Sequence, residues 1–310
     1  MKTAFLFPGQ GSQYVGMCKE LYENFESVRN IYEEAGNILK TNIKKIMLNG
    51  TQNDLSNSST AQTLIYLTSI SVLNAIHDLN LNPAAVAGHS FGEYAALTYL
   101  GLFSWQQGLD IVAHRGQYMN EAAKENDGAM CAVMSGDDEI INDIQNAVST
   151  YGGYAVPVNY NTPKQTVFAG YKKDINKVIS LCESKKIRAI LLNVSGAFHT
   201  GLMASAAEKF EKYLETVEFS TDIKNIDFYS NLTGAVLDKD IDMKDYLCKH
   251  IISPVKFKNE IVAINHNQID TFIEIGPKKT LSSFVKQTLK NVSIYNVEDM
   301  ASFEKLKMNI

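Results

Sequence analysis

The segment GHSFG at residues 88–92 places a serine, Ser90, between two glycines. The apolar run at residues 84–87 predicts the end of a buried strand, and residues 93–100 predict the first turns of a helix. A G-x-S-x-G sequence between a strand and a helix is typical of a sharp turn that exposes the serine oxygen above a sheet. Ser90 is therefore a candidate nucleophile, and a tight structural turn is the alternative.

A serine hydroxyl attacks effectively only when a base takes its proton, so one of the six histidines is needed. His199 lies in a loop between a predicted strand and a predicted helix, a position that suits a general base beside a cleft. His89 adjoins Ser90, but neighbouring side chains diverge on such a turn, and His77 occupies a polar helix end. His199 is thus the candidate base, although most loop histidines are only surface polar groups.

Arg115 falls on the apolar face of a helix predicted over residues 105–125. Val112, Met119 and Ala122 share that face at helical spacing. A guanidinium in such a place extends to solvent, pairs with a structural carboxylate, or binds an anionic ligand. Judged by the helix pattern alone, the structural ion pair is favoured.

Polar and glycine residues follow the first predicted strand in FPGQGSQ, residues 7–13. This segment is too polar to continue the strand and is expected to form a loop at its carboxyl end. Ligand sites of α/β folds gather at that end of the sheet. An ordinary strand-to-helix turn is the alternative.

Alternating apolar runs and helical patterns over the first hundred residues predict a parallel sheet covered by helices. From residue 128 to residue 195 the order is strand–helix–strand–strand–helix–strand, which is typical of a ferredoxin-like subdomain. The predicted fold class is α/β, a parallel-sheet core with that subdomain inserted, so residues 1–127 and 196–310 would form the large domain. Further elements are expected as helices near 16–39, 60–79, 202–216, 258–267 and 280–290, the last closing the chain, and strands near 187–194, 226–231 and 270–276.

Composition and charge exclude several classes of function. The chain has 310 residues, a net charge of −5 and no basic block, so nucleic-acid binding is not expected. No signal peptide and no apolar run of about 18 residues is present, so neither secretion nor a membrane span is expected. The four cysteines lie far apart, which favours a reducing cytoplasm. Zinc signatures and phosphate-binding glycine loops are absent, so neither a metal nor a bound cofactor is predicted.

Seven segments, in order and at consistent spacing, resemble the malonyl-CoA:acyl-carrier-protein transacylase family. They are FPGQGSQYVGM (7–17), GHSFGEY (88–94), HRGQYM (114–119), NYNTPKQTVFAG (159–170), GAFH (196–199), SPVKF (253–257) and IEIGPKKTL (273–281). The likeness covers nearly the whole chain and is especially close to the free-standing acyltransferases that serve polyketide synthases lacking their own. It also implies a hydrolase-like α/β core with a ferredoxin-like subdomain.

The resemblance assigns the residues of the reaction itself. It makes Ser90 the nucleophile and His199 its base, and it places the backbone amides of Phe91 and Gln10 at the oxyanion of the tetrahedral intermediate. Arg115 matches the arginine that binds the free malonyl carboxylate through two hydrogen bonds, which replaces the structural ion pair favoured by the helix pattern.

Three further positions follow from the same resemblance. Asn161 and Arg188 align with positions near the coenzyme A entrance. His250 falls where the family uses a main-chain carbonyl to orient the catalytic histidine, and no acidic third member of a triad is assigned. The family usually has glutamine there, so the side chain of His250 could add a second titrating group. The segment AQTL at residues 61–64 also lacks a proline common in the family.

The predicted activity is a two-step acyl transfer that needs no bound cofactor, with the coenzyme A thioester as substrate. Malonyl would pass from malonyl-CoA to Ser90 and then to the phosphopantetheine thiol of an acyl carrier protein, and the enzyme is expected to be a monomer. Because carrier proteins are acidic and this chain is net negative, docking would use a local basic patch, Lys172–Lys173 or Lys278–Lys279.

Three other functions remain as alternatives. A proofreading hydrolase of acyl carrier thioesters would tend to lack Arg115, a docking module would need neither Ser90 nor His199, and an unrelated esterase would not need a buried arginine. The GAFH segment favours malonyl-selective polyketide enzymes, but the sequence does not separate polyketide from fatty-acid carriers.

Overall fold

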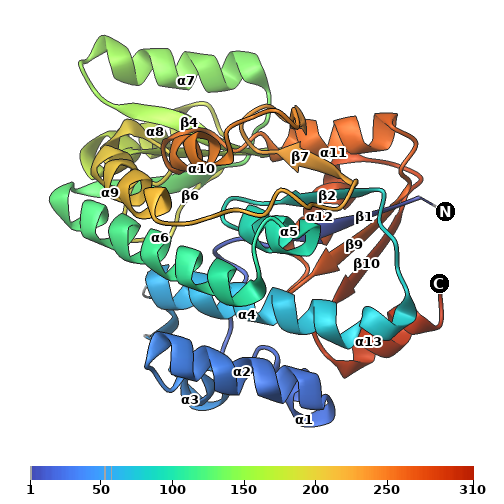
Figure 1. Cartoon of the computed structure of the whole chain (residues 1–310). Coiled ribbons are helices and arrows are strands. Elements are labelled where there is room, and N and C mark those ends of the chain that lie inside the picture. Colours follow the sequence, from blue (N-terminus) through green and yellow to red (C-terminus); the bar gives the residue numbers. More distant parts are fainter. Residues whose placement is uncertain (1, 52–53, 57) are drawn as a thin grey trace.

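A six-stranded sheet forms the core of the larger part of the molecule (Figure 1). The computed structural model describes residues 2–51, 54–56 and 58–310. Five neighbouring strands are parallel, in the order β10-β9-β1-β2-β7, and β8 pairs antiparallel with β7 at one edge. The strands are β1 (Thr3–Phe7), β2 (Ala85–Gly88), β7 (Asp227–Ser230), β8 (Ala235–Val236), β9 (Thr271–Ile275) and β10 (Ser293–Val297).

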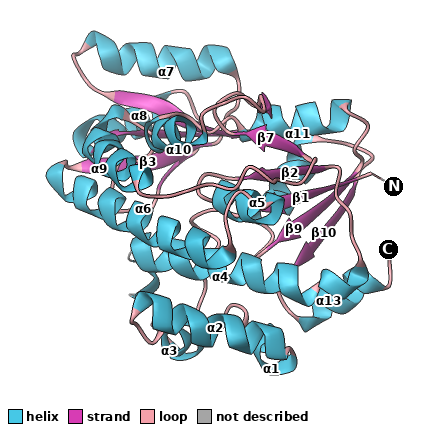
Figure 2. Ribbon diagram, viewed as in Figure 1, coloured by secondary structure: helices cyan, strands magenta, loops and turns pink. Residues whose placement is uncertain are grey.

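Helices cover both faces of this sheet, as Figure 2 shows by colour. Alternate residues of a strand point to opposite faces, so β1 must be apolar on both sides. Phe5 and Phe7 pack in the core cluster that includes buried residues of the helices Ser58–Ala75, Gly92–Leu100 and Trp105–Glu125. Ala4 and Leu6 pack on the other face against the helices Phe257–His266 and Thr280–Thr288.

Helices of the described residues pack around the two sheets and are named here in chain order. They are α1 (Lys19–Asn24), α2 (Glu26–Leu39), α3 (Ile43–Asn49), α4 (Ser58–Ala75), α5 (Gly92–Leu100), α6 (Trp105–Glu125), α7 (Asp138–Thr150), α8 (Lys172–Ser184), α9 (Ala204–Glu215), α10 (Met243–Ile252), α11 (Phe257–His266), α12 (Thr280–Thr288) and α13 (Met300–Lys307), with short 3-10 turns at Asp54–Ser56, His77–Leu79 and Gly201–Met203.

A smaller antiparallel sheet lies beside the large one, with strand order β4-β5-β3-β6. Its strands are β3 (Gly128–Val133), β4 (Ala155–Thr162), β5 (Gln165–Tyr171) and β6 (Ala189–Leu191). Helices α7 and α8 cover one face, where Cys131 and Phe168 pack with Ile144 and Val178. Residues of the other face, among them Met130, Ala132 and Val167, line the cavity described below.

Backbone hydrogen bonds join the two sheets through the loop between α10 and α11. The amide of Val255 donates to Val158 O at 2.7 Å, and the amide of Tyr160 donates to Val255 O at 2.9 Å. Val255 thereby forms an isolated parallel bridge with Asn159 of β4. The small sheet is thus fixed at its β4 edge to the loop between α10 and α11.

The predicted α/β fold class, with one parallel and one antiparallel sheet, is confirmed, whereas three element predictions need correction. The helix expected near 16–39 breaks at Phe25, which is extended (φ −116°, ψ 122°). The strand expected over 187–194 shortens to β6. The chain does not close on α12, because β10 and α13 follow it. β10 is a half-exposed edge strand with a weak apolar pattern. The domain boundaries at residues 127/128 and 195/196 stay a prediction.

Within the described residues, no helix has the length and apolar character that a membrane crossing requires. In the same residues, no group of three or more histidine, cysteine or acidic side chains is placed to hold a metal ion. The four cysteines are all free thiols.

Candidate active site

The carboxyl ends of neighbouring parallel strands bring distant segments to one edge of the large sheet. The loop after β1 carries Gln10, the turn after β2 carries Ser90, and Asn231 follows β7 directly. A site built at this edge can draw its groups from several strand ends at once. The small sheet faces the same edge, and the cavity lies between the two.

The turn at Ser90 has the tight geometry predicted for it. Ser90 has φ +53°, a left-handed conformation that a residue with a side chain adopts only when its surroundings hold it there. A side chain at Gly92 would overlap the carbonyl oxygen of Phe7, and one at Gly88 would overlap the backbone of Glu93. The two glycines therefore let β1, β2 and α5 approach closely enough to present the serine.

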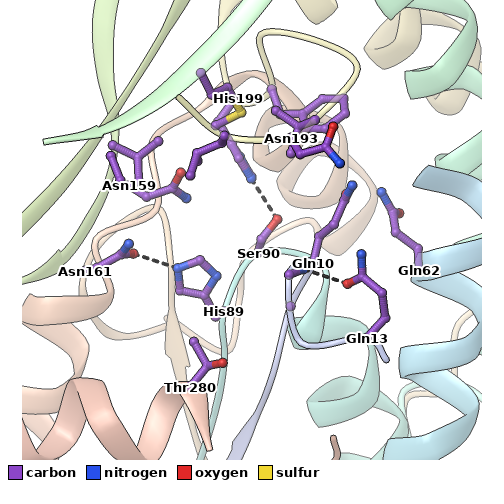
Figure 3. Close-up of a pocket in the computed structure, with 18 of the residues that line it drawn as sticks. Gln10, Gln13, Gln62, His89, Ser90, Asn159, Asn161, Asn193, His199 and Thr280 are labelled. Atoms are coloured by element: carbon purple, nitrogen blue, oxygen red, sulfur yellow. Dashed lines mark hydrogen bonds between the residues drawn. The ribbon is translucent and has the colours of Figure 1, made fainter. Parts of the chain in front are cut away.

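Ser90 and His199 meet directly, as Figure 3 shows. Ser90 Oγ lies 2.7 Å from His199 Nε2. His199 Nδ1 faces two carbonyl oxygens, of His250 at 3.2 Å and of Ser253 at 3.0 Å. Because carbonyl oxygens only accept hydrogen bonds, Nδ1 carries the ring proton and Nε2 is free to accept the proton of the serine hydroxyl.

The environment of His199 keeps its ring neutral. Burial, together with the positive charge of Arg115, lowers the pKa of His199 to about 3. The unprotonated form is the one that can take a proton from Ser90. The two carbonyl acceptors raise this pKa, but by less than burial lowers it.

Almost all backbone amides around Ser90 donate hydrogen bonds to other groups of the chain. The amides of His89, Gly92 and Glu93 donate to backbone carbonyls, and the amide of Ser90 donates to Asn231 Oδ1 at 2.8 Å. Among the described residues, the amide of Phe91 has no acceptor, although its side chain is buried. The amide of Phe91 is thus the one in this turn that remains available for a ligand oxygen, and Gln10 lines the cavity beside it.

The cavity between the sheets has a volume of about 490 Å³ and contains both reacting side chains. Its wall includes residues from the loops after β1 and β2, from strands of the small sheet and from helices α4, α6 and α12. The polar and charged side chains of the wall include Gln10, Gln62, His89, Ser90, Arg115, Asn161 and His199. This volume is in the range of sites for small organic ligands.

Arg115 is completely buried on α6 and contributes to the cavity wall. Its Nη1 donates to Gln62 Oε1 at 2.8 Å, and its guanidinium lies over the ring of Tyr94 at 5.5 Å. Its Nε and Nη2 have no hydrogen-bond partner among the described residues, and no carboxylate of those residues forms an ion pair with it. The structural ion pair that the helix pattern favoured is therefore not what the structure places there.

The remaining predicted positions fall into different surroundings. Asn161 lines the cavity, where its Oδ1 lies 2.8 Å from His89 Nε2 and its Nδ2 donates to Gln165. Arg188 is exposed and is not part of the cavity wall. The ring of His250 is buried behind His199, and burial lowers its pKa well below 6.5. It therefore stays neutral near pH 7 rather than adding a second titrating group there.

The two lysine pairs considered for docking also differ in place. Lys172 and Lys173 begin α8, on the helix-covered side of the small sheet. Lys278 precedes α12 and its Nζ donates to Gly11 O at 3.0 Å, beside the loop that carries Gln10.

The sequence did not reveal three groups of this site: the side chains of Gln62 and Asn231 and the carbonyl of Ser253. Gln62 lies in the AQTL segment, noted only for a missing proline. Ser253 acts through its carbonyl, which every residue type has. Asn231 carried one usable signal, since a polar residue directly after a buried strand lies at the ligand-binding edge of an α/β sheet.

Comparisons with known proteins cover the chain from end to end. The model of the acyl transferase domain family matches residues 4–309. A malonyl CoA-acyl carrier protein transacylase of Bacillus subtilis (strain 168) is 37% identical over 306 residues, covering 98% of this chain and 95% of the relative. The crystal structure of a malonyl CoA-acyl carrier protein transacylase from Clostridium perfringens has a TM-score of 0.94 at 35% identity, covering 100% of this chain and 97% of the other.

One similar structure contains a partner. It is a malonyl-transacylase in complex with a type II polyketide synthase acyl-carrier protein, similar to this chain with a TM-score of 0.94 at 29% identity and full coverage of both chains.

Proposed function

The chain belongs to the acyl transferase family of malonyl CoA-acyl carrier protein transacylases, and from this premise we propose how its residues transfer malonyl. Malonyl moves from malonyl-CoA to Ser90 and then to the phosphopantetheine thiol of an acyl carrier protein. The observation that carries the proposal is the buried, unneutralised Arg115 in the same cavity as the Ser90–His199 pair.

In the first half of the reaction, Ser90 Oγ attacks the thioester carbonyl while its proton passes to His199 Nε2. The developing oxyanion accepts hydrogen bonds from the amides of Phe91 and Gln10. Collapse of the tetrahedral intermediate breaks the carbon–sulfur bond, and the coenzyme A thiolate takes the proton from His199. The products are coenzyme A and a malonyl ester on Ser90.

The second half repeats these steps with a different nucleophile. The carrier thiol gives its proton to His199 and attacks the ester carbonyl, and Ser90 leaves with that proton. No metal or bound cofactor takes part in either half. The carbonyl oxygens of His250 and Ser253 keep the imidazole in the orientation that both halves require.

Replacement of Arg115 tests the substrate assignment. Malonyl-CoA and acetyl-CoA differ by one carboxylate, and acetyl leaves the buried guanidinium without a charged partner. We expect a preference for malonyl of about 2–5 kcal/mol, or roughly 30- to several-thousand-fold in kcat/KM. Arg115→Ala should remove most of this preference by impairing malonyl while sparing acetyl, as measured with both thioesters and one carrier protein.

Arg115→Lys is the matched variant, and it should recover little malonyl transfer because an ammonium group cannot form the planar two-pronged pair. Equal losses of malonyl and acetyl transfer in Arg115→Ala would instead make Arg115 a structural residue. The same assay addresses the hydrolase alternative, which the comparisons do not support: free malonate should form far more slowly than malonyl carrier protein.

The lowered pKa of His199 predicts an unusual pH profile. A histidine with its ordinary pKa near 6.5 would lose basicity as the pH falls through that value. His199 is neutral until the pH approaches about 3. We expect kcat/KM for malonyl-CoA to stay nearly constant from about pH 8 down to about pH 5, where the malonyl carboxylate is still ionised.

The positive charge of Arg115 is one cause of that lowered pKa, so Arg115→Ala should move the acidic limb of the profile to higher pH. Circular dichroism at each pH controls for unfolding. A wild-type profile that falls to half near pH 6.5 would show that His199 titrates normally in the free enzyme.

We also propose a cellular compartment and a class of carrier protein for this enzyme. A cytoplasmic enzyme is supported by the four free cysteines and by the acyl carrier chemistry. Service to a polyketide rather than a fatty-acid carrier rests on the GAFH segment at residues 196–199 and remains a prediction. Lys278, which lies beside the Gln10 loop, is better placed than Lys172–Lys173 to meet a carrier at the cavity.

A further inference from the structure

The side chain of Asn231 uses every hydrogen bond that an amide can make. Its Oδ1 accepts from the amide of Ser90 at 2.8 Å and from His250 Nε2 at 3.2 Å. Its Nδ2 donates to Gly88 O at 2.6 Å and to Glu260 Oε1 at 2.9 Å. Since a backbone amide can only donate and a carbonyl can only accept, this orientation of the side chain is fixed by its partners.

Two of those four bonds hold the turn that carries the nucleophile. Asn231 binds the carbonyl of Gly88 before Ser90 and the amide of Ser90 itself, and so bridges the point at which the chain takes φ +53°. A strained conformation persists only when neighbouring groups fix it. Because its amide is occupied by Asn231, Ser90 presents only its side chain to the cavity.

A third bond connects Asn231 to the support of the base, while the fourth ends on Glu260 of α11. His250, whose ring donates to Asn231 Oδ1, also provides a carbonyl oxygen to His199 Nδ1. Asn231 therefore contacts the nucleophile directly and the base through one intervening residue. No other described side chain bonds both to the Ser90 turn and to α10 residues that hold His199.

The surroundings of Asn231 are buried titratable groups from three helices. Glu93 of α5 accepts from the backbone amide of Asn231 at 2.7 Å and from Tyr246 of α10, while Glu260 lies on α11. Burial raises the pKa of Glu93 to about 8 and that of Glu260 well above its ordinary value. Arg115 is the cation that acts on this group, and it lowers the pKa of Glu93. A neutral amide fits this largely uncharged pocket.

We propose that Asn231 is a positioning residue for acyl transfer. It holds the Ser90 turn in a fixed position relative to His250, whose carbonyl orients His199. The proposal rests on the proposed function, because it concerns the same acylation step. Loss of the amide should allow the turn to relax without changing the cavity wall that binds malonyl-CoA, since Asn231 is not part of that wall.

The test is the rate and extent of malonyl loading, followed by mass spectrometry after rapid mixing with malonyl-CoA. In Asn231→Ala the loading rate constant should fall about 100-fold, the effect expected when reacting groups shift by about 1 Å. The malonyl-CoA concentration that gives half the maximal rate should change by less than about threefold, and loading should still reach one malonyl per chain.

Asn231→Asp is the second variant and has nearly the same shape. When protonated, the introduced carboxyl keeps one donor and one acceptor, and when ionised it has no donor for Gly88 O or Glu260. Its loading rate should therefore rise as the pH is lowered from about 8 to about 5, whereas the wild-type rate stays flat. This dependence can be measured even if Asn231→Ala does not fold.

Ile144→Ala is the matched control, because it creates a cavity between α7 and the helix-covered face of the small sheet. It should lower the melting temperature while leaving the loading rate constant unchanged. The positioning role would be overturned if Asn231→Ala loaded malonyl with the wild-type rate constant, whether or not the loaded fraction was smaller. A flat pH profile of the loading rate in Asn231→Asp would overturn it as well. Failure of the wild-type chain to load malonyl would instead contradict the proposed function.

Discussion

Ser90→Ala should abolish covalent loading, so that incubation with malonyl-CoA adds no malonyl group while the wild-type chain gains one. The reason is that no other described hydroxyl has both the 2.7 Å contact with His199 and the position beside the free Phe91 amide. Transfer to a carrier protein should fall by about 10⁴- to 10⁶-fold, because binding and the oxyanion amides cannot replace the nucleophile. Intact-mass spectrometry and a carrier-loading assay measure the two effects.

Ser180→Ala is the control for this substitution. Ser180 is an exposed serine on α8, and its replacement should leave loading unchanged. Malonyl found on Ser90→Ala at another residue, with transfer to the carrier preserved, would show that the turn at residues 88–92 is structural.

His199→Ala should cost nearly as much, on the order of 10⁴-fold or more in the loading rate, because serine and histidine act as a unit. Ser90 then has no acceptor for its proton, and the carbonyl oxygens of His250 and Ser253 lose their donor. The concentration dependence of loading should change little, since His199 is not expected to bind the coenzyme. Rapid-mixing mass spectrometry separates the two quantities.

His266→Ala, which alters an exposed histidine at the end of α11, controls for general effects of losing an imidazole. Loading by His199→Ala within about tenfold of the wild-type rate would mean that another group serves as base, because loss of the base from a serine–histidine pair normally slows the reaction by several orders of magnitude. His89 is the neighbouring histidine, but its ring bonds to Asn161 rather than to Ser90.

The parts of this site that could be predicted are those with a local signal. Ser90 was found from a strand, a turn and a helix adjacent in sequence, and the structure forms that turn as expected. Helical spacing predicted that Arg115 lies on the apolar face of its helix, but it did not predict that the guanidinium has no carboxylate partner. That property depends on which side chains α4 and α5 bring near α6, and helical periodicity does not contain this information.

What could not be predicted depends on contacts between distant segments. The carbonyl of Ser253 reaches His199 across 54 positions in the chain, and Asn231 reaches the Ser90 amide across 141. A carbonyl contact leaves no trace in residue type. The same limit applies to the fold: β10 was missed because a half-exposed edge strand gains its stability from pairing with β9 rather than from its own pattern.

The backbone bridge at Val255 has a consequence for synthesis of the chain on the ribosome. Two residues before this bridge, Ser253 provides the carbonyl that orients His199. A nascent chain that has already exposed the Ser90 segment therefore still lacks an oriented base, and acquires it only when the segment around residue 253 emerges and docks onto β4. The order of the segments along the chain thus places the nucleophile well before the groups that orient its base.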